Sequence, residues 1–403
     1  KLRKTNSRIN WAISGCATLC KSIVDRDLLF KKWKMSKNEA DHSMFKRARN
    51  RVNTLIRHAK ERYYASRLDT KLPSKQLWNN IKNLGINRKE THVINDFSAD
   101  EINNAFCQNF TISDTPINDS FQHNVHNSDC FYFDHIDQDD VVHAMYSIKS
   151  NAIGLDRIPI KFVKSICPVI IKPITHLFNS IITTSVFPDA WKSAKVIPIK
   201  KKTNITSVDN LRPISILCAL SKIFEKIVKK DICNYIRTND MLCQYQSGYR
   251  SKHSTKTAML KVLDDIGLIL DKGRPVVLIL LDFSKAFDTV SFNILCRKLS
   301  TQFNFANHSV NLIKSYLKSR FQTVFNNGTY SEFASIKSGV PQGSILGPLL
   351  FSLYISDLAD VVTNCKIHLF ADDVHLYYDC SKNSAAEISL SINSDLRKIQ
   401  EWA

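Results

Sequence analysis

The fold is decided by the apolar segment PVVLILLD, residues 275–282. It places six consecutive valine, leucine and isoleucine side chains directly before one carboxylate, Asp282. A continuous apolar run of this length, rich in β-favouring residues, is typical of a strand that is buried on both faces. The segment therefore predicts a core strand that presents an acidic side chain at its carboxyl end.

A second acidic signal lies in IHLFADDVHLYY, residues 367–378. Two strand-like arms flank Asp372 and Asp373, which predicts a β-hairpin with an acidic two-residue tip. Adjacent carboxylates repel each other and gain stability only where a cation neutralises them. Successive strand residues point to opposite faces, so only one of the pair can aim at a metal shared with Asp282, and we assign that primary role to Asp372. An ordinary turn is the alternative for the pair alone, and the third carboxylate argues against it.

Carboxylate oxygens are the ligands that Mg²⁺ prefers, with Mn²⁺ as the alternative ion. Two such ions can activate an attacking hydroxyl and stabilise the leaving oxygen of a phosphoryl transfer. We therefore predict that Asp282, Asp372 and Asp373 are both metal ligands and catalytic residues.

Charge divides the 403-residue chain, whose 56 Lys and Arg residues outnumber 37 Asp and Glu residues. Residues 1–90 hold 23 basic and 7 acidic residues, whereas residues 91–140 hold ten acids and no Lys or Arg. This predicts a basic helical extension over 1–90, an acidic linker over 91–140 and a larger domain after it. Hydrophobic residues at 44% exclude wholesale disorder, and no apolar run is long enough for a membrane span. The 11 cysteines include no C-x-x-C pair, so we expect reduced thiols and an intracellular protein.

The basic extension has apolar residues at helical spacing over 45–68, interleaved with basic ones, which predicts an amphipathic helix. Further helices are expected over 11–33 and 75–84. A solvated face or a membrane-surface helix is the alternative reading, but so large a basic excess favours a polyanion. The residues expected to bind nucleic acid are Arg47, Arg49, Arg51, Arg57, Lys60 and Arg62.

Three segments, in this order and at this spacing, resemble the successive palm motifs of reverse transcriptases: LDFSKAFD (281–288), SGVPQGSILGP (338–348) and FADD (370–373). Upstream segments resemble the fingers blocks of reverse transcriptases from non-LTR (LINE-type) retrotransposons, in particular jockey-like elements of insects. These segments are GLDRIP (154–159), WK (191–192), VIPIK (196–200), LRPIS (211–215), QSGYR (246–250) and ST (254–255). One departure is the lead NAI (151–153), where the family has a Ser-Pro-Gly-like sequence.

The resemblance covers residues from about 141 to the end, and it implies an α+β right-hand polymerase fold. Fingers are expected over 141–272 and a palm, built on an antiparallel sheet with helices, over 273–403. The basic extension also resembles the region that precedes the polymerase in this family. The family's primer-gripping hairpin and thumb should follow residue 403, so we expect the thumb to be absent from this chain.

The resemblance also gives roles to residues around the aspartates. The ring of Phe287 would press against the sugar of the incoming nucleotide and reject a 2′-hydroxyl by a steric clash; an ordinary core phenylalanine is the alternative. Gln342 and Gly343 lie in a Pro-Gln-Gly loop, where glycine allows close backbone approach and the amide can bind the nucleotide. Lys200 and Arg212 are the expected triphosphate ligands, although residues 201 and 202 are lysines that compete with Lys200.

The implied activity is that of an RNA-directed DNA polymerase, which adds dNTPs to a primer 3′-hydroxyl with Mg²⁺ or Mn²⁺. Its partners would be an RNA template, a DNA primer and the RNA–DNA hybrid, in a ribonucleoprotein of the nucleus and cytoplasm. The sequence does not indicate an oligomeric state. Two alternatives remain open: an intron-encoded maturase-type enzyme, and a catalytically inactive, truncated or repurposed element that only binds RNA.

Overall fold

The computed structural model of the chain describes residues 17–67, 72–73, 76–77, 94, 96–108, 130–201, 207–380 and 384–403. The chain forms two compact units, Lys1–His92 and Val93–Ala403, and each is described by itself. Most of the helix expected at 75–84 lies outside the described residues. Among the described residues we find no helix with both the length and the apolar character that crossing a membrane requires.

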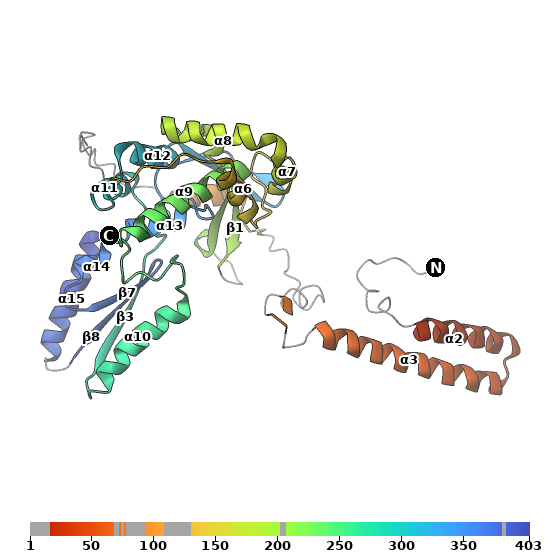
Figure 1. The fold of residues 1–403 in the computed structure, drawn as a ribbon. Coiled ribbons are helices and arrows are strands. Elements are labelled where there is room, and N and C mark those ends of the chain that lie inside the picture. Colours follow the sequence, from red (N-terminus) through yellow and green to blue (C-terminus); the bar gives the residue numbers. More distant parts are fainter. Residues whose placement is uncertain are drawn as a thin grey trace. The chain divides into compact units, whose positions relative to one another are not determined.

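The N-terminal unit is a pair of helices, α2 (Ala17–Ser36) and α3 (Glu39–Arg67), which lie side by side (Figure 1). Val52 on α3 is fully buried, as its place in the apolar stripe requires. The helix predicted for residues 45–68 is present, and it begins six residues earlier.

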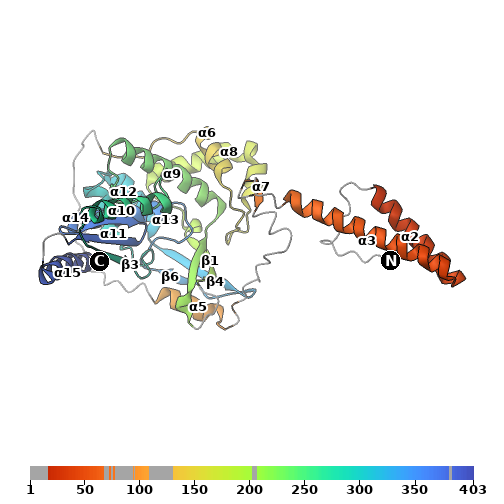
Figure 2. The ribbon, with the colours of Figure 1, turned by 90° about the horizontal axis from the view of Figure 1, so that it is seen from below.

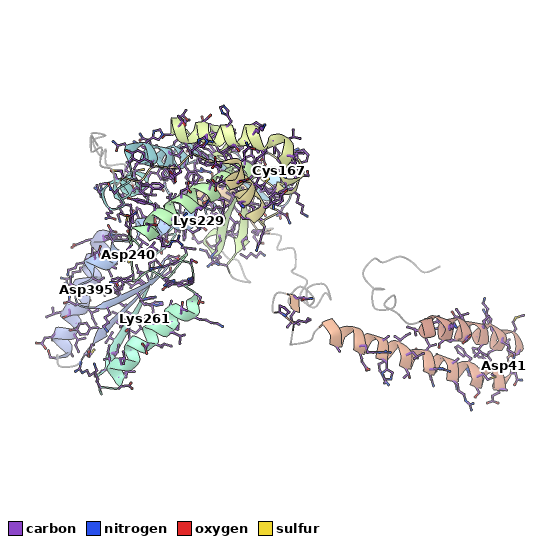
Figure 3. The ribbon with its side chains drawn as sticks, in the orientation of Figure 1. Asp41, Cys167, Lys229, Asp240, Lys261 and Asp395 are labelled. Atoms are coloured by element: carbon purple, nitrogen blue, oxygen red, sulfur yellow. The ribbon has the colours of Figure 1, made fainter. Side chains whose placement is uncertain are left out.

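The connection between these two helices is fixed by one carboxylate and an aromatic cluster. Asp41 accepts a hydrogen bond from Ser36 Oγ at 2.6 Å and pairs with Lys32 Nζ at 3.1 Å (Figure 3). Trp33 and Phe45 stack with ring centroids 5.7 Å apart. This small unit therefore closes its apolar face mainly with aromatic rings.

The C-terminal unit contains a three-stranded antiparallel sheet in the order β3–β8–β7 (Figure 1). The strands are β3 (Val276–Asp282), β7 (Lys366–Phe370) and β8 (Asp373–Asp379). Helix α10 (Thr255–Leu270) packs against β3 and β7. The strand predicted at 275–282 and the hairpin predicted at 367–378 are confirmed.

Two details of that prediction were wrong. Strand β3 is not buried on both faces: Ile279 and Leu281 are only partly buried against the core, and Leu278 and Leu280 on the other face are 47% and 66% exposed, because α10 covers that face of this edge strand only in part. The hairpin turn consists of Ala371 and Asp372, not of the two aspartates, because Asp373 already pairs with Phe370 as the first residue of β8.

A second, five-stranded sheet has the order β2–β1–β4–β5, with β6 also paired to β4. Within it β1 pairs antiparallel with β2 and parallel with β4, so the sheet is mixed. It joins strands from both sides of residue 272, so the segments expected to be fingers and palm share a sheet. These strands are β1 (Ser193–Lys200), β2 (Leu211–Ile216), β4 (Arg320–Asn326), β5 (Thr329–Tyr330) and β6 (Ala334–Ile336).

Part of the acidic stretch packs against this mixed sheet. Helix α5 (Ala99–Cys107) lies beside β1 and β4 (Figure 2). It begins with a capping box between Ser98 and Glu101, and it buries Ile102 and Phe106 with Val196 in a second core cluster. Within the stretch expected to be a linker over 91–140, residues 94 and 96–107 thus contribute apolar side chains to the folded unit.

The main core lies between the helices and the inner face of the β7–β8 hairpin. It includes Phe178, Phe224, Leu312, Leu350 and Val374, all at most 2% exposed. The chain is thus an α+β protein, as predicted. The remaining helices are α6 (Gln138–Ser147), α7 (Ile160–Ser165), α8 (Cys167–Thr184), α9 (Ala219–Thr238), α11 (Phe292–Thr301), α12 (Asn307–Leu317), α13 (Gly347–Tyr354), α14 (Leu358–Val361) and α15 (Ala385–Trp402), with short 3-10 turns η1 (Asp189–Trp191) and η2 (Val208–Asn210).

Candidate active site

The three predicted catalytic carboxylates lie at one end of the three-stranded sheet. Asp282 is the last residue of β3 and is the register partner of Asp373, the first residue of β8. Paired residues of antiparallel strands project from the same face of the sheet. Asp372 lies in the adjoining turn and is partly buried, whereas the other two are exposed. The register thus places Asp373, rather than Asp372, directly opposite Asp282.

Electrostatics link Asp372 to both other carboxylates. Burial raises the pKa of Asp372, and the charges of Asp373 and Asp282 raise it further, while its own backbone and Arg212 act in the opposite direction. A shared charge environment of this kind is typical of sites that bind cations. Arg212, which we predicted to be a triphosphate ligand, therefore lies within electrostatic reach of the aspartates.

Phe287 is partly buried and lies between two other rings. It stacks on Phe351 with ring centroids 4.4 Å apart and meets the edge of Tyr249 at 6.0 Å. Burial raises the pKa of the Tyr249 hydroxyl, and the charge of Asp372 adds to this effect. One side of Phe287 thus packs on Phe351 of the core. Its other aromatic neighbour, Tyr249, lies close enough to Asp372 for that charge to act on its hydroxyl.

The Pro-Gln-Gly loop packs on strand β2. The Gln342 carbonyl accepts a hydrogen bond from Ser215 N at 2.7 Å, and its side-chain Nε2 donates to Asp288 Oδ1 at 3.0 Å. Gly343 has φ +109°, and a Cβ there would lie 2.6 Å from Ser215 O. Glycine is therefore required for this loop to approach the strand that carries Arg212.

The structure does not bring Lys200 and Arg212 together. Arg212 pairs with Ile199, whereas Lys200 pairs with Leu211, a residue of the second core cluster. Neighbouring strand residues alternate between faces, so Lys200 and Arg212 project from opposite faces of the β1–β2 ribbon. Lys201, the competitor of Lys200, donates from Nζ to the backbone oxygen of Asp209 at 2.9 Å.

The predicted nucleic-acid-binding residues all lie on α3. Arg47, Arg49, Arg51, Arg57 and Arg62 are exposed, and Lys60 lies in the same helix. Arg57 forms an i,i+4 ion pair with Glu61 at 3.9 Å, while Arg49 lies over the ring of Phe45 at 6.0 Å. Because these arginine side chains are exposed, a polyanion can reach them from solvent.

Comparison with known proteins decides the family. Residues 199–403, half of the chain, match the family described as "Reverse transcriptase (RNA-dependent DNA polymerase)". The chain belongs to the reverse transcriptase family. The predicted resemblance to jockey-like non-LTR elements is also confirmed by the relatives of this reverse transcriptase.

Three relatives come from Drosophila melanogaster. "Probable RNA-directed DNA polymerase from transposon BS" is 28% identical over 274 residues, 66% of this chain and 30% of that protein. "RNA-directed DNA polymerase from mobile element jockey" is 32% identical over 235 residues, covering 56% and 25%, respectively. "Probable RNA-directed DNA polymerase from transposon X-element" is 32% identical over 236 residues, covering 57% and 25%. The matched part therefore spans 25–30% of the length of these relatives.

A separate match falls on the helix pair: residues 20–74 match the family described as "Female sterile protein K10 C-terminal domain".

The donor set fits a hard divalent cation in its chemistry, because the three carboxylates lie at the end of one sheet and supply only oxygen ligands. Their side chains do not converge as a cluster: in the described part of the chain, no group of three His, Cys, Asp or Glu side chains is close enough to hold a metal ion. Three like charges repel each other, and a bound cation is what would allow them to converge.

Sequence reasoning missed two acids of this reverse transcriptase. Asp288 holds the Gln342 amide, and burial raises its pKa; its signal was a second acid in the motif at 281–288. Glu225 on α9 is fully buried and accepts hydrogen bonds from the backbone N–H groups of Ile345 and Leu346. No local pattern in the sequence marked this acid, because Ser221 and Lys222 share its buried helix face.

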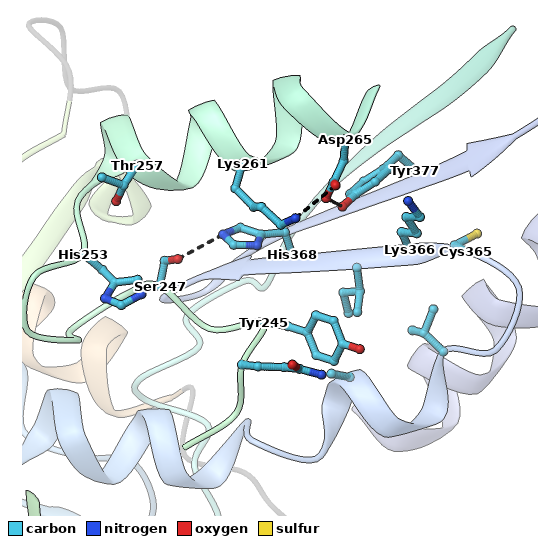
Figure 4. Close-up of a pocket in the computed structure, with 14 residues that line it drawn as sticks. Tyr245, Ser247, His253, Thr257, Lys261, Asp265, Cys365, Lys366, His368 and Tyr377 are labelled. Atoms are coloured by element: carbon cyan, nitrogen blue, oxygen red, sulfur yellow. Dashed lines mark hydrogen bonds and ion pairs between the residues drawn. The ribbon is translucent and has the colours of Figure 1, made fainter. Parts of the chain in front are cut away.

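A cavity of about 650 Å³ lies beside the hairpin, between α10, β7 and the segment around Tyr245 (Figure 4). Asp265 on α10 accepts from the Tyr377 hydroxyl at 2.7 Å and pairs with Lys261 at 3.0 Å. Ser247 Oγ lies 3.1 Å from His368 Nε2. The predicted site residues of this reverse transcriptase are not among those that line it.

Proposed function

We propose that this chain carries the catalytic site of the RNA-directed DNA polymerase of a jockey-like non-LTR retrotransposon. The observation that carries the proposal is the register pairing of Asp282 with Asp373, with Asp372 in the adjoining turn, inside the segment that matches the reverse transcriptase family. The relatives are described as RNA-directed DNA polymerases of mobile elements, which supports the same activity here.

Asp282, Asp372 and Asp373 would hold two divalent cations, with Asp372 in the primary role and Asp373 in a secondary one. When bound, Mg²⁺ or Mn²⁺ activates the primer 3′-hydroxyl and stabilises the leaving oxygen of the dNTP. Three carboxylates at one end of a sheet supply the oxygen ligands that such ions prefer. The partial burial of Asp372 favours its interaction with a cation, because burial penalises a charge that is not neutralised.

Residues around the carboxylates would bind and select the nucleotide. Arg212, on the strand against which the Pro-Gln-Gly loop packs, would neutralise the triphosphate. Lys200 is the second proposed triphosphate ligand, and it would have to reach the triphosphate from the opposite face of the β1–β2 ribbon. Phe287 would exclude a 2′-hydroxyl from the position that the nucleotide sugar occupies. Gln342 and Gly343 would line the same position and contact the nucleotide.

The helix pair would bind the backbone of the template RNA or of the RNA–DNA hybrid. Arg47, Arg49, Arg51, Arg57, Lys60 and Arg62 supply the cations for a contact that follows phosphates and does not read bases.

Primer extension tests this function. A labelled DNA primer on an RNA template is mixed with dNTPs and Mg²⁺, and the added nucleotides are resolved. Because the chain matches 25–30% of its relatives' length, the assay uses the chain alone and the chain joined to the C-terminal part of a jockey reverse transcriptase. We expect extension that EDTA abolishes. Hybrid binding without extension in either protein would instead establish the alternative, an element that only binds RNA.

A further inference from the structure

The hairpin turn that carries Asp372 has a backbone conformation that its sequence does not favour. Ala371, the first residue of the two-residue turn, has φ +59°. Hairpins with a left-handed residue at this position normally have glycine there, because a Cβ crowds the neighbouring backbone. A non-glycine residue keeps such a conformation only where its surroundings enforce it.

Gln246 supplies that enforcement through both polar groups of the Ala371 backbone. Its Oε1 accepts the Ala371 N–H at 2.9 Å, and its Nε2 donates to the Ala371 carbonyl at 3.1 Å. The same Oε1 accepts Gly248 N–H at 2.6 Å. Gln246 is only 5% exposed, so water does not compete for these bonds.

The segment that carries Gln246 is itself fastened to the hairpin. Leu369 N donates to Tyr245 O at 2.8 Å, and Ser247 N donates to Leu369 O at 2.9 Å, which makes a short parallel pairing along β7. The Ser247 hydroxyl meets His368 next to it (Figure 4). The glutamine is therefore positioned by the strand whose turn it supports.

Gly248 brings the segment into direct contact with the turn. A Cβ at this position would lie 2.1 Å from Ala371 N and 2.7 Å from Ala371 Cα, both of them backbone atoms. No side chain fits there unless the turn moves. The segment 245–248 and the turn 371–372 thus form one packed unit from parts of the chain more than 120 residues apart.

We propose that Gln246 is a positioning residue, which holds the Ala371–Asp372 turn at the end of the sheet, where the Asp372 carboxylate would join Asp282 and Asp373 when a cation binds. The inference rests on the metal-ligand role of Asp372 in the proposed function. Gln246 touches neither substrate nor metal and acts only through the backbone of the turn.

The test measures binding of Mn²⁺ alone to the whole chain by electron paramagnetic resonance, with no polymerase activity involved. Gln246→Met removes all three hydrogen bonds of the side chain while keeping an unbranched side chain of similar size. The matched control is Gln322→Met, because Gln322 is 4% exposed and also donates a buried side-chain hydrogen bond, to Asn103 Oδ1 at 2.9 Å. Gly248→Ala displaces the turn by a steric clash with the Ala371 backbone. Melting curves and hydrogen exchange of residues 369–378 are measured for each variant.

Gln246→Met should weaken Mn²⁺ binding by about 10-fold or more, as is usual when groups that orient metal ligands are lost. It should also speed hydrogen exchange in residues 369–378, and Gly248→Ala should do the same. Gln322→Met should keep Mn²⁺ affinity within about twofold of wild type.

The proposal is overturned if Gln246→Met binds Mn²⁺ as tightly as Gln322→Met does while hydrogen exchange in its hairpin is faster. The turn would then be loosened without consequence for the metal. Failure of the proposed function gives a different result from failure of the Gln246 proposal. If Asp372→Asn binds Mn²⁺ as well as wild type does, the metal assignment itself is wrong, and the role of Gln246 falls with it.

Discussion

The basic face of helix α3 and two buried carboxylates of the C-terminal unit use charge in opposite ways. On α3 of the N-terminal unit, Arg47, Arg49 and Arg51 are all exposed. In the C-terminal unit, the carboxylates of Glu225 and Asp395 are completely buried, at 0% exposure (Figure 3 labels Asp395). Exposed charges interact through solvent and are screened by salt, whereas buried charges must be bonded in place by the fold.

The buried carboxylates hold loops by their backbone. Glu225 Oε2 accepts from Ile345 N at 2.8 Å and Leu346 N at 3.2 Å, so it fixes the start of α13 directly after the Pro-Gln-Gly loop. Burial alone would raise the pKa of Asp395, but bonds from backbone N–H groups, including that of Cys365, outweigh it and lower the pKa. The arginines of α3 thus offer charge for contacts, whereas Glu225 and Asp395 use charge to set the geometry of loops.

The largest predicted effect is on the rate of dNTP addition, and it concerns the carboxylates at the end of the three-stranded sheet. Asp282→Asn or Asp372→Asn should lower the rate of dNTP addition by at least about 1000-fold, because each removes a metal ligand that acts in the transition state. Asp373→Asn should cost less, since we assign it the secondary role. Single-nucleotide incorporation on a primed RNA template measures this, in whichever form of the protein extends the primer.

Binding of the hybrid should stay nearly unchanged in these variants, because the contacts that bind its backbone lie elsewhere. Asp264→Asn is the control, since Asp264 is an exposed aspartate on α10 of the same unit. Incorporation near the wild-type rate in Asp282→Asn or Asp372→Asn would rule out the two-metal assignment.

The second effect concerns Phe287. Shortening its ring should relieve the clash with a 2′-hydroxyl, so Phe287→Val should raise kcat/KM for ribonucleotides relative to deoxynucleotides by about tenfold or more. If Phe287 is only a core residue stacked on Phe351, the variant loses at most about 2 kcal/mol of unfolding free energy and uses both nucleotides in an unchanged ratio.

Phe283→Val is the matched control, because Phe283 is also partly buried and packs on Trp402. It should lower the melting temperature without changing the nucleotide ratio. A constant ratio in Phe287→Val would remove Phe287 from the site and leave the three aspartates in place.

The third effect, on the exposed charges, is smaller. Replacing Arg47 and Arg51 together with glutamine should lower the slope of log affinity against log salt by about 1.4 to 1.8, if each arginine contacts one phosphate. Deleting residues 1–90 should flatten the slope further. Titration of labelled RNA between low and moderate salt measures it. Lys161→Gln with Lys172→Gln removes the same charge from exposed positions of the C-terminal unit as a control. An equal slope in the arginine variant and wild type would mean that these charges are only solvated.

The features that the sequence could predict are those that depend on residues close together in the chain. The strand at 276–282, the hairpin and the basic helix follow from patterns that repeat within a few residues, and all three are present. The partners of Glu225 and Gln246 lie about 120 residues away in sequence, so no local pattern announces their roles. The exposure of Leu280 was missed for the same reason, because the elements that cover each face of a sheet are known only once the fold is assembled.

The smallest effect concerns Asp231 on α9, whose burial is the main reason that its pKa is raised to about 6, with the nearby acids Asp134 and Asp140 adding to it. Because the folded state binds this proton more tightly than the unfolded state, the group's contribution to stability is complete below the ordinary pKa and is lost as the pH rises through about 6. Asp231→Asn removes the titrating group and should therefore be more stable than wild type at pH 7.5, by about 1 to 2 kcal/mol, and no more stable near pH 4. Melting curves at the two pH values should show a gain of about 2 to 4 °C at pH 7.5 alone. Asp264→Asn, at an exposed aspartate of α10, is the control for the loss of a carboxylate. An equal gain at both pH values would mean that the asparagine stabilises the helix for reasons other than charge, and Asp231 would then no longer count among the buried charges of this unit.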